Sequence, residues 1–123
     1  MILVDTSIWI DHFRVGDAIV RDLLSDGKVA IHPWIIGELA VGNYADRGAV
    51  LKDLGKLVKT AMATDGEVLR FIEAHALFGT GISYIDAGLL ASTKLTPGAS
   101  LWTRDKRLRA AAEALFVDAK LTH

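Results

Sequence analysis

The sequence predicts an α/β fold, in which helices flank a parallel sheet in a single three-layer domain covering residues 1–123. Three observations lead to this prediction. Short apolar runs rich in β-branched residues alternate with longer stretches whose apolar residues recur every three or four positions. The length suits one hydrophobic core, and a hydrophobic content of 51% is too high for a disordered chain. Alternating strands and helices favour parallel pairing, because each helix returns the chain to the same end of the sheet.

The first half of the chain contributes two of the expected strands. Residues 1–4 form an apolar, β-branched run that predicts a buried strand, and Ser7 is the expected N-cap of a short helix after it. A second helix is expected over residues 17–24, because turn residues follow it directly. Residues 28–32 return to strand character, and Pro33 then opens a further helical stretch.

The second half repeats the alternation of strands and helices. Its strand candidates are short runs, expected at residues 60–64, 100–103 and 115–117. Its helices show apolar residues at helical spacing, and they are expected at residues 49–58, after a cap at Asp65, and at 83–95 and 106–115. No repeat, linker or low-complexity segment divides the chain.

Composition excludes several classes of protein. No run reaches the roughly 18 apolar residues of a membrane span, and the first residues lack the basic region and cleavage site of a signal peptide. The absence of cysteine excludes disulfides and thiolate metal sites, and fits a reducing compartment. We therefore expect a cytoplasmic protein without a membrane partner. A net charge of −1 gives no general attraction to nucleic acid, so any such binding depends on a local patch or a bound cation.

Four acidic residues from distant segments fall where an α/β sheet binds its ligands. Asp5 and Asp105 directly follow predicted strands. Glu38 lies a few residues past the second strand, and Asp86 lies in the first turn of a helix after a glycine-containing loop. Ligands bind beyond the carboxyl ends of such strands, so these acids are expected to converge there. Converging like charges require a cation or raised pKa values, and an all-oxygen ligand set favours Mg²⁺ or Mn²⁺.

Each of these acids alone also suits a purely structural role. Asp5 and Asp105 are suitable helix N-caps, Asp86 is a favourable first-turn acid, and Glu38 fits a solvated helix face. As a set they favour a metal site, because Asp5 directly follows an apolar strand. A divalent ion in such a site would support phosphodiester hydrolysis, since that reaction needs an activated water and charge stabilisation at phosphorus.

Four short motifs, in order, point to a known family. They are LVDTSIWID from Leu3, GEL from Gly37, YIDAGLLAS from Tyr84 and LWTRDKRL from Leu101. The chain resembles the PIN-domain ribonucleases over Ile2 to Val117, and most closely the VapC-type toxins of toxin–antitoxin pairs. The resemblance implies a PIN-like parallel sheet and an endoribonuclease that depends on Mg²⁺ or Mn²⁺ and hydrolyses RNA. It also implies a homodimer and a separately encoded antitoxin.

The resemblance assigns roles to particular residues. The four acids of the family match Asp5, Glu38, Asp86 and Asp105, as catalytic metal ligands, the last of them directly or through water. Thr103 matches the hydroxyl that often accompanies the fourth acid. Arg107 stands where some members carry a further acid, so no fifth ligand is expected. Arg104 and Lys106 are candidates for contacts to RNA phosphates, although basic residues on a solvated helix face are common.

Two other functions stay open at this stage. A receiver-like signalling module would use Asp53 as phosphoacceptor, but Asp53 lies in a helical pattern rather than at a strand end. A PIN-like domain that binds RNA or protein without cutting is the other alternative, because the presence of four acids does not demonstrate turnover.

The aromatic residues Trp9, Trp34 and Trp102 would either stack on unpaired bases or fill the core.

Overall fold

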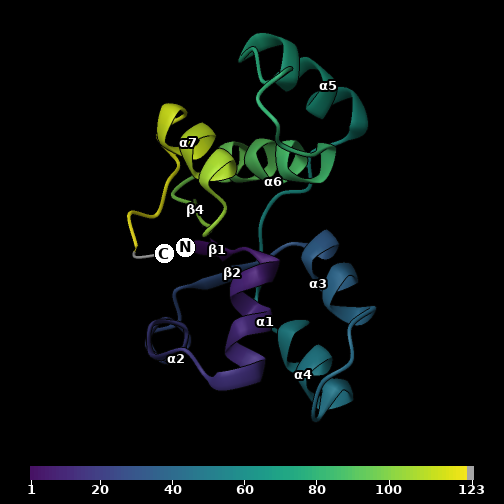
Figure 1. Ribbon diagram of the computed structural model, residues 1–123, viewed down its shortest axis with the longest axis vertical. Helices are drawn as coiled ribbons and strands as arrows, with labels where there is room; N and C mark the ends of the chain where they lie inside the picture. The colour runs from purple at the N-terminus through teal and green to yellow at the C-terminus, as the bar shows by residue number, and fades with distance from the viewer. Residues whose placement is uncertain (122–123) are drawn as a thin grey trace.

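The computed structural model describes residues 1–121, which form a four-stranded parallel sheet between two layers of helices (Figure 1). The strands are β1 (Ile2–Val4), β2 (Val29–Ile31), β3 (Val58–Lys59) and β4 (Ser100–Trp102). Their order in the sheet is β3-β2-β1-β4, and every pair is parallel. A bridge between Leu101 and Asp118 extends the sheet beyond β4. The predicted domain runs to residue 123, and its last two residues lie outside the described part.

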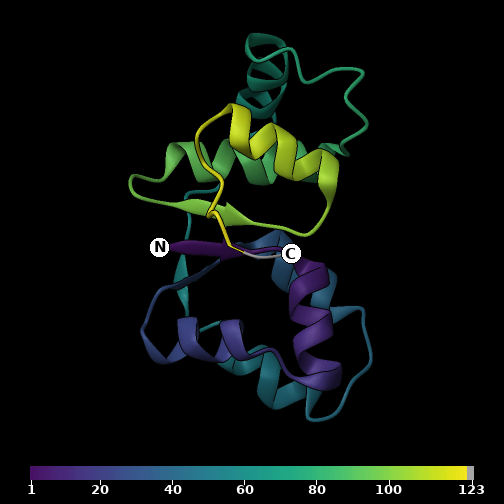
Figure 2. The same ribbon diagram turned by 60° about the vertical axis from the view of Figure 1, so that its left-hand side comes forward.

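The helices of the described residues fall into two groups on opposite faces of the sheet (Figures 1 and 2). One group is α1 (Thr6–Val15), α2 (Ala18–Ser25), α3 (Pro33–Ala40) and α4 (Arg47–Leu54). The other is α5 (Asp65–Ala74), α6 (Tyr84–Leu95) and α7 (Lys106–Ala114), with α5 packed on the outer side of α6. This arrangement agrees with the predicted three-layer α/β architecture.

The core fills both faces of the sheet with apolar side chains. Leu3 and Val4 of β1 and Leu101 of the neighbouring β4 are fully buried, as are the indoles of Trp9 and Trp102. Of the two roles considered for Trp9 and Trp102, the structure shows core filling and not base stacking, because neither ring reaches solvent. Among residues 1–121 no helix is long and apolar enough to cross a membrane.

Two helix caps differ from the sequence prediction. Asp5, not Ser7, caps α1, because the Asp5 Oδ1 atom accepts the Thr6 N–H at 2.8 Å and the helix begins directly after the strand. Thr64 rather than Asp65 caps α5, in a capping box with Glu67. In both cases the preceding short polar side chain satisfies the first free N–H groups of the helix.

The middle of the chain also differs from the prediction. The fourth helix ends at Leu54 instead of residue 58, and the next strand is Val58–Lys59 instead of residues 60–64. This strand has two exposed residues and exists through its pairing with β2, where Ala30 faces Val58. A local sequence pattern does not contain that long-range pairing.

Candidate active site

Asp5 lies at the centre of the candidate site, at the carboxyl end of β1. Its Oδ1 atom accepts the Thr6 N–H, and its Oδ2 atom accepts the Thr103 hydroxyl at 2.7 Å. Burial raises the pKa of the Asp5 carboxyl, and the two hydrogen bonds oppose that rise. The neighbouring charges of Asp86 and Glu38 raise it further. Asp86 and Glu38 therefore both lie within electrostatic range of Asp5.

Thr103 joins the ends of the neighbouring strands β1 and β4. It directly follows β4, which pairs with β1 so that Trp102 faces Val4, and its side chain is buried. The Thr103 hydroxyl donates to Asp5 and accepts the backbone N–H of Asp105 at 3.1 Å. A single hydroxyl thus fixes the orientation of one acid and the position of another.

Glu38 reaches the site from α3 on the same face of the sheet as α1. The helix begins at Pro33, and the buried His32 caps it, with the His32 Nδ1 atom accepting the Trp34 N–H at 3.0 Å. The Glu38 side chain is exposed, and its Oε1 atom accepts the hydroxyl of Thr6 at 2.9 Å. The residue that follows Asp5 therefore orients Glu38.

Asp86 comes from α6, on the opposite side of the sheet. Its N–H donates to the Ser83 hydroxyl at 3.0 Å, and the Ser83 N–H donates to the Asp86 Oδ2 atom at 3.3 Å. This capping box fixes the first turn of the helix and directs the carboxylate toward its N-terminal end. The spacing of serine and aspartate in the sequence is a readable sign of the box, although the prediction did not use it.

Asp105 joins the group through Thr103. It is exposed, and its Oδ1 atom caps α7 by accepting the Leu108 N–H at 2.9 Å. As the side chains stand, no three acidic or histidine side chains among residues 1–121 form a group that could hold a metal ion. Each acid accepts hydrogen bonds from nearby N–H or O–H donors, which favour its charged form and fix its orientation. The all-oxygen chemistry of the set still fits a hard ion such as Mg²⁺ or Mn²⁺.

The two basic candidates differ in their surroundings. The Arg104 guanidinium donates to Asp11 at 3.1 Å and to Asp17 at 2.6 Å, and it lies 5.4 Å from the centre of the Trp102 ring. Its charge is therefore compensated within the protein, which argues against its predicted contact with RNA. Lys106 is exposed at the first residue of α7. Of the two it is better suited to a phosphate contact.

Asp53 lies on α4, a helix that contributes none of the four candidate acids. It forms an ion pair of 3.6 Å with Lys56, in which both side chains are largely exposed. A receiver phosphoacceptor would follow a strand, so the structure gives the receiver-like alternative no support.

Comparison with known proteins agrees with this architecture. The profile of the PIN domain matches residues 2–114. Ribonuclease VapC32 of Mycobacterium tuberculosis, from strains CDC 1551 / Oshkosh and ATCC 25618 / H37Rv, is 49% identical over 111 residues, which are 90% of each chain. The crystal structure of PAE2754 from Pyrobaculum aerophilum has the same fold, with a TM-score of 0.58 and 22% identity over 94% of this chain and 92% of that one. Both the predicted fold and the predicted resemblance are confirmed, and the chain belongs to the PIN-domain family.

Proposed function

We propose that this protein is an endoribonuclease that hydrolyses RNA phosphodiester bonds and is the toxin of a VapC-type toxin–antitoxin pair. The observation that carries the proposal is the convergence of Asp5, Glu38 and Asp86 at the carboxyl end of the parallel sheet. Threonine hydroxyls orient the carboxylates of Asp5 and Glu38, and the Ser83 N–H orients that of Asp86. The 49% identity to a ribonuclease over 90% of the chain supports the same activity.

The proposed cofactor is Mg²⁺ or Mn²⁺. Asp5, Glu38 and Asp86 would hold it, with Asp105 acting directly or through a water molecule. When bound, a divalent ion lowers the pKa of water and stabilises the charge that develops on a phosphodiester. The negative charge collected around Asp5, which contributes to its raised pKa, is what such a cation would neutralise.

The protein's own side chains position this chemistry. Thr103 holds the Asp5 carboxylate in one orientation, and Thr6 does the same for Glu38. Ser83 fixes Asp86 at the start of α6. Outer hydrogen-bond partners of this kind are worth about 10- to 100-fold in metal affinity or activity. Lys106 is proposed to bind an RNA phosphate, which positions the strand without reading its sequence.

The proposed partners follow from the relationship to the VapC ribonuclease. They are an RNA substrate, a second copy of the chain and a separately encoded antitoxin. We also propose a cytoplasmic location, which the lack of cysteine in the sequence supports.

Cleavage of a panel of labelled single-stranded RNAs tests the proposal. The purified protein is assayed with Mg²⁺, Mn²⁺ or EDTA, beside the variants Asp5→Asn and Asp86→Asn. Asp53→Asn is the matched control, because it removes the same charge from an exposed site on α4. We expect metal-dependent cleavage by the wild type and the control, and none by the two site variants. Cleavage that persists in EDTA and in both variants would reject the proposed site, and RNA binding without cleavage would favour a non-catalytic domain.

A further inference from the structure

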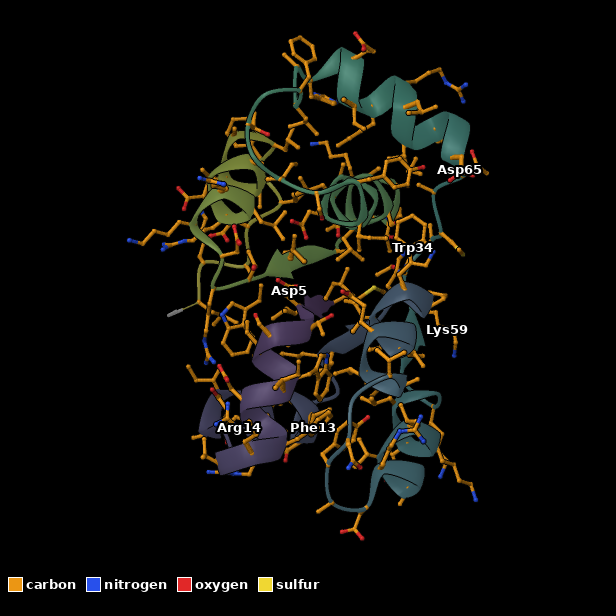
Figure 3. The ribbon with its side chains drawn as sticks, turned by 45° about the vertical axis from the view of Figure 1, so that its right-hand side comes forward. Asp5, Phe13, Arg14, Trp34, Lys59 and Asp65 are labelled. Carbon is orange, nitrogen blue, oxygen red and sulfur yellow. The ribbon has the colours of Figure 1, made fainter. Side chains whose placement is uncertain are left out.

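Two aromatic side chains lie beside the candidate acids and are not explained by the chemistry above. The rings of Trp34 and Tyr84 have centroids 6.1 Å apart and are inclined by 37°. Trp34 belongs to the first turn of α3, and Tyr84 is the first residue of α6. Figure 3 shows Trp34 where α3 meets α6, between the labelled Asp5 and Asp65. The pair therefore bridges the two helix layers at the edge where the acids converge.

Each aromatic residue shares its helix with one of the acids. Trp34 and Glu38 are four residues apart on α3, so they lie on the same face of that helix, about one turn or 5.4 Å apart along its axis. Tyr84 and Asp86 are only two residues apart in the first turn of α6, so their side chains point in different directions around that helix. The adjacency of rings and acids therefore rests on Trp34: a group that contacts its ring would be next to a group held by Glu38.

The two rings are held in place before any ligand binds. A Cβ atom at Gly88 would lie 2.9 Å from the Cη2 atom of Trp34, so the indole edge packs directly on the backbone of α6. The His32 ring also contacts the indole, with the two ring centroids 5.3 Å apart and the rings in an edge-to-face arrangement. The Tyr84 hydroxyl donates to the Oδ1 atom of Asp65 at 2.7 Å, which holds the phenol between α5 and α6.

The pair is nevertheless not part of the core. The Tyr84 side chain is 41% exposed and Trp34 is half-buried, whereas the other two tryptophans are each about 1% exposed. A large aromatic surface that is rigid and partly open to solvent is suited to stacking on another planar ring. This aromatic surface lies beside carboxylates, which repel phosphate groups. The neutral base of a nucleotide is therefore a better ligand for the two rings than its phosphate.

We propose that Trp34 and Tyr84 form a stacking site for one unpaired RNA base, belonging to a nucleotide next to the phosphate that the acids would bind through the proposed metal ion. The inference rests on the proposed ribonuclease function and adds to it a preference for single-stranded substrate. Stacking tolerates any base, because every base has a π face. The site would hold the strand in position without specifying its sequence.

The test compares side chains that have an aromatic ring with apolar side chains that lack one. Tyr84→Leu and Trp34→Leu remove the flat ring and keep an apolar contact, whereas Tyr84→Phe keeps the ring and loses only the hydroxyl. Binding of a short fluorescent single-stranded RNA is measured by anisotropy with Mg²⁺ in an Asp5→Asn background, so that the RNA is not cut. We expect the two leucine variants to bind about 5- to 100-fold more weakly, and Tyr84→Phe to bind as the parent does.

A second measurement separates stacking from a general structural effect. The same RNA is prepared with a single abasic nucleotide at each position in turn. At one position the missing base should weaken binding to the parent but not to Tyr84→Leu, because that variant has already lost the ring. Equal losses in both proteins at every position would overturn the stacking site.

Two further results would be decisive. If Tyr84→Leu changes the particle mass in light scattering, the ring belongs to a contact between subunits and the stacking site is rejected. If the leucine variants bind and cleave as the wild type does, the inference fails while the ribonuclease function stands. Conversely, ring-dependent binding by a wild type that cuts no RNA would keep the stacking site and reject the ribonuclease.

Discussion

Replacing Thr103 by valine removes one hydroxyl from the centre of the site and keeps the shape of the side chain. In the wild type that hydroxyl donates to the Asp5 carboxylate at 2.7 Å and accepts the Asp105 N–H at 3.1 Å, inside a residue that is 1% exposed. A hydrogen bond to a charged group contributes about 1.5–3 kcal/mol, and valine gives no compensating polar contact. We therefore expect Thr103→Val to lower the free energy of unfolding by about 2–3 kcal/mol at pH 7.

The same substitution should change the titration of Asp5. The Thr103 hydrogen bond lowers the pKa of that carboxyl against the effect of burial, so its loss should raise the pKa further. The stability loss should shrink toward about 1 kcal/mol near pH 4, because a neutral carboxyl accepts a weaker hydrogen bond. Cleavage should fall by about 10- to 100-fold, as for other residues that orient a ligand. Urea denaturation at both pH values and carboxyl ¹³C NMR measure these effects.

Thr60 provides the matched control for this substitution. Its side-chain hydroxyl is also buried, but it has no hydrogen-bond partner among residues 1–121. Thr60→Val should therefore leave the free energy of unfolding unchanged or raise it slightly, because it removes an unsatisfied polar group. Equal destabilisation by the two valines, or an Asp5 pKa that does not move in Thr103→Val, would refute the reasoning.

Four more predictions test other parts of the structure. Asp5→Asn should raise the urea midpoint at pH 7 and lose that advantage as the pH falls to 3.8, because the raised pKa of Asp5 makes its ionised form destabilising; a lower midpoint at pH 7 would contradict this. Burial lowers the pKa of His32 below 6.5, so stability should fall as the pH drops below 6.5, and His32→Asn should flatten that slope; an unchanged slope in the variant would argue against His32. Gly88→Ala, on α6, should cost about 1–3 kcal/mol in urea denaturation, because the added methyl group would overlap with the indole of Trp34 from α3. The exposed control Gly37→Ala on α3, where nothing lies within 4 Å, should instead gain about 0.5–1 kcal/mol, and a similar gain at Gly88 would contradict the packing. Lys106→Gln should reduce the slope of log K against log salt for RNA binding by about 0.7, and an unchanged slope would remove the phosphate contact.

Local patterns predicted the parts of the fold that local chemistry decides. Three of the four strands lie within the predicted ranges, because apolar β-branched runs flanked by turns identify buried strands. The exception, β3, has only two residues, of which Val58 is 57% exposed, and it is a strand because it pairs with β2. The last predicted strand is present as the pairing of Leu101 with residues 117–119, where the bridge partner is Asp118 instead of a residue in the predicted range 115–117.

The topology of the sheet also predicted that the acids converge, but not what orients them. The hydroxyl of Thr6 reaches Glu38 across 32 residues of sequence, and Thr103 reaches Asp5 across 98. The ion pair from Arg104 to Asp11 spans 93 residues. Such pairs arise from how helices and strands pack, and no spacing along the chain encodes them. For this reason the sequence made Arg104 a candidate for a phosphate contact, whereas the structure shows it paired with Asp11 and Asp17.

The structural and functional interpretations of the acids turn out to be compatible. Asp5 and Asp105 cap helices, and Asp86 completes a capping box, so all three carboxylates lie at helix N-termini, where the helix dipole stabilises negative charge. Glu38 lacks such a position and is held by the Thr6 hydroxyl instead. Since asparagine caps a helix about as well as aspartate, Asp→Asn at the two N-caps, Asp5 and Asp105, should remove charge and activity while keeping the fold, whereas Asp→Ala should also cost about 1 kcal/mol of stability. Asparagine and alanine variants that lose equal stability would show that these two residues do not act as caps.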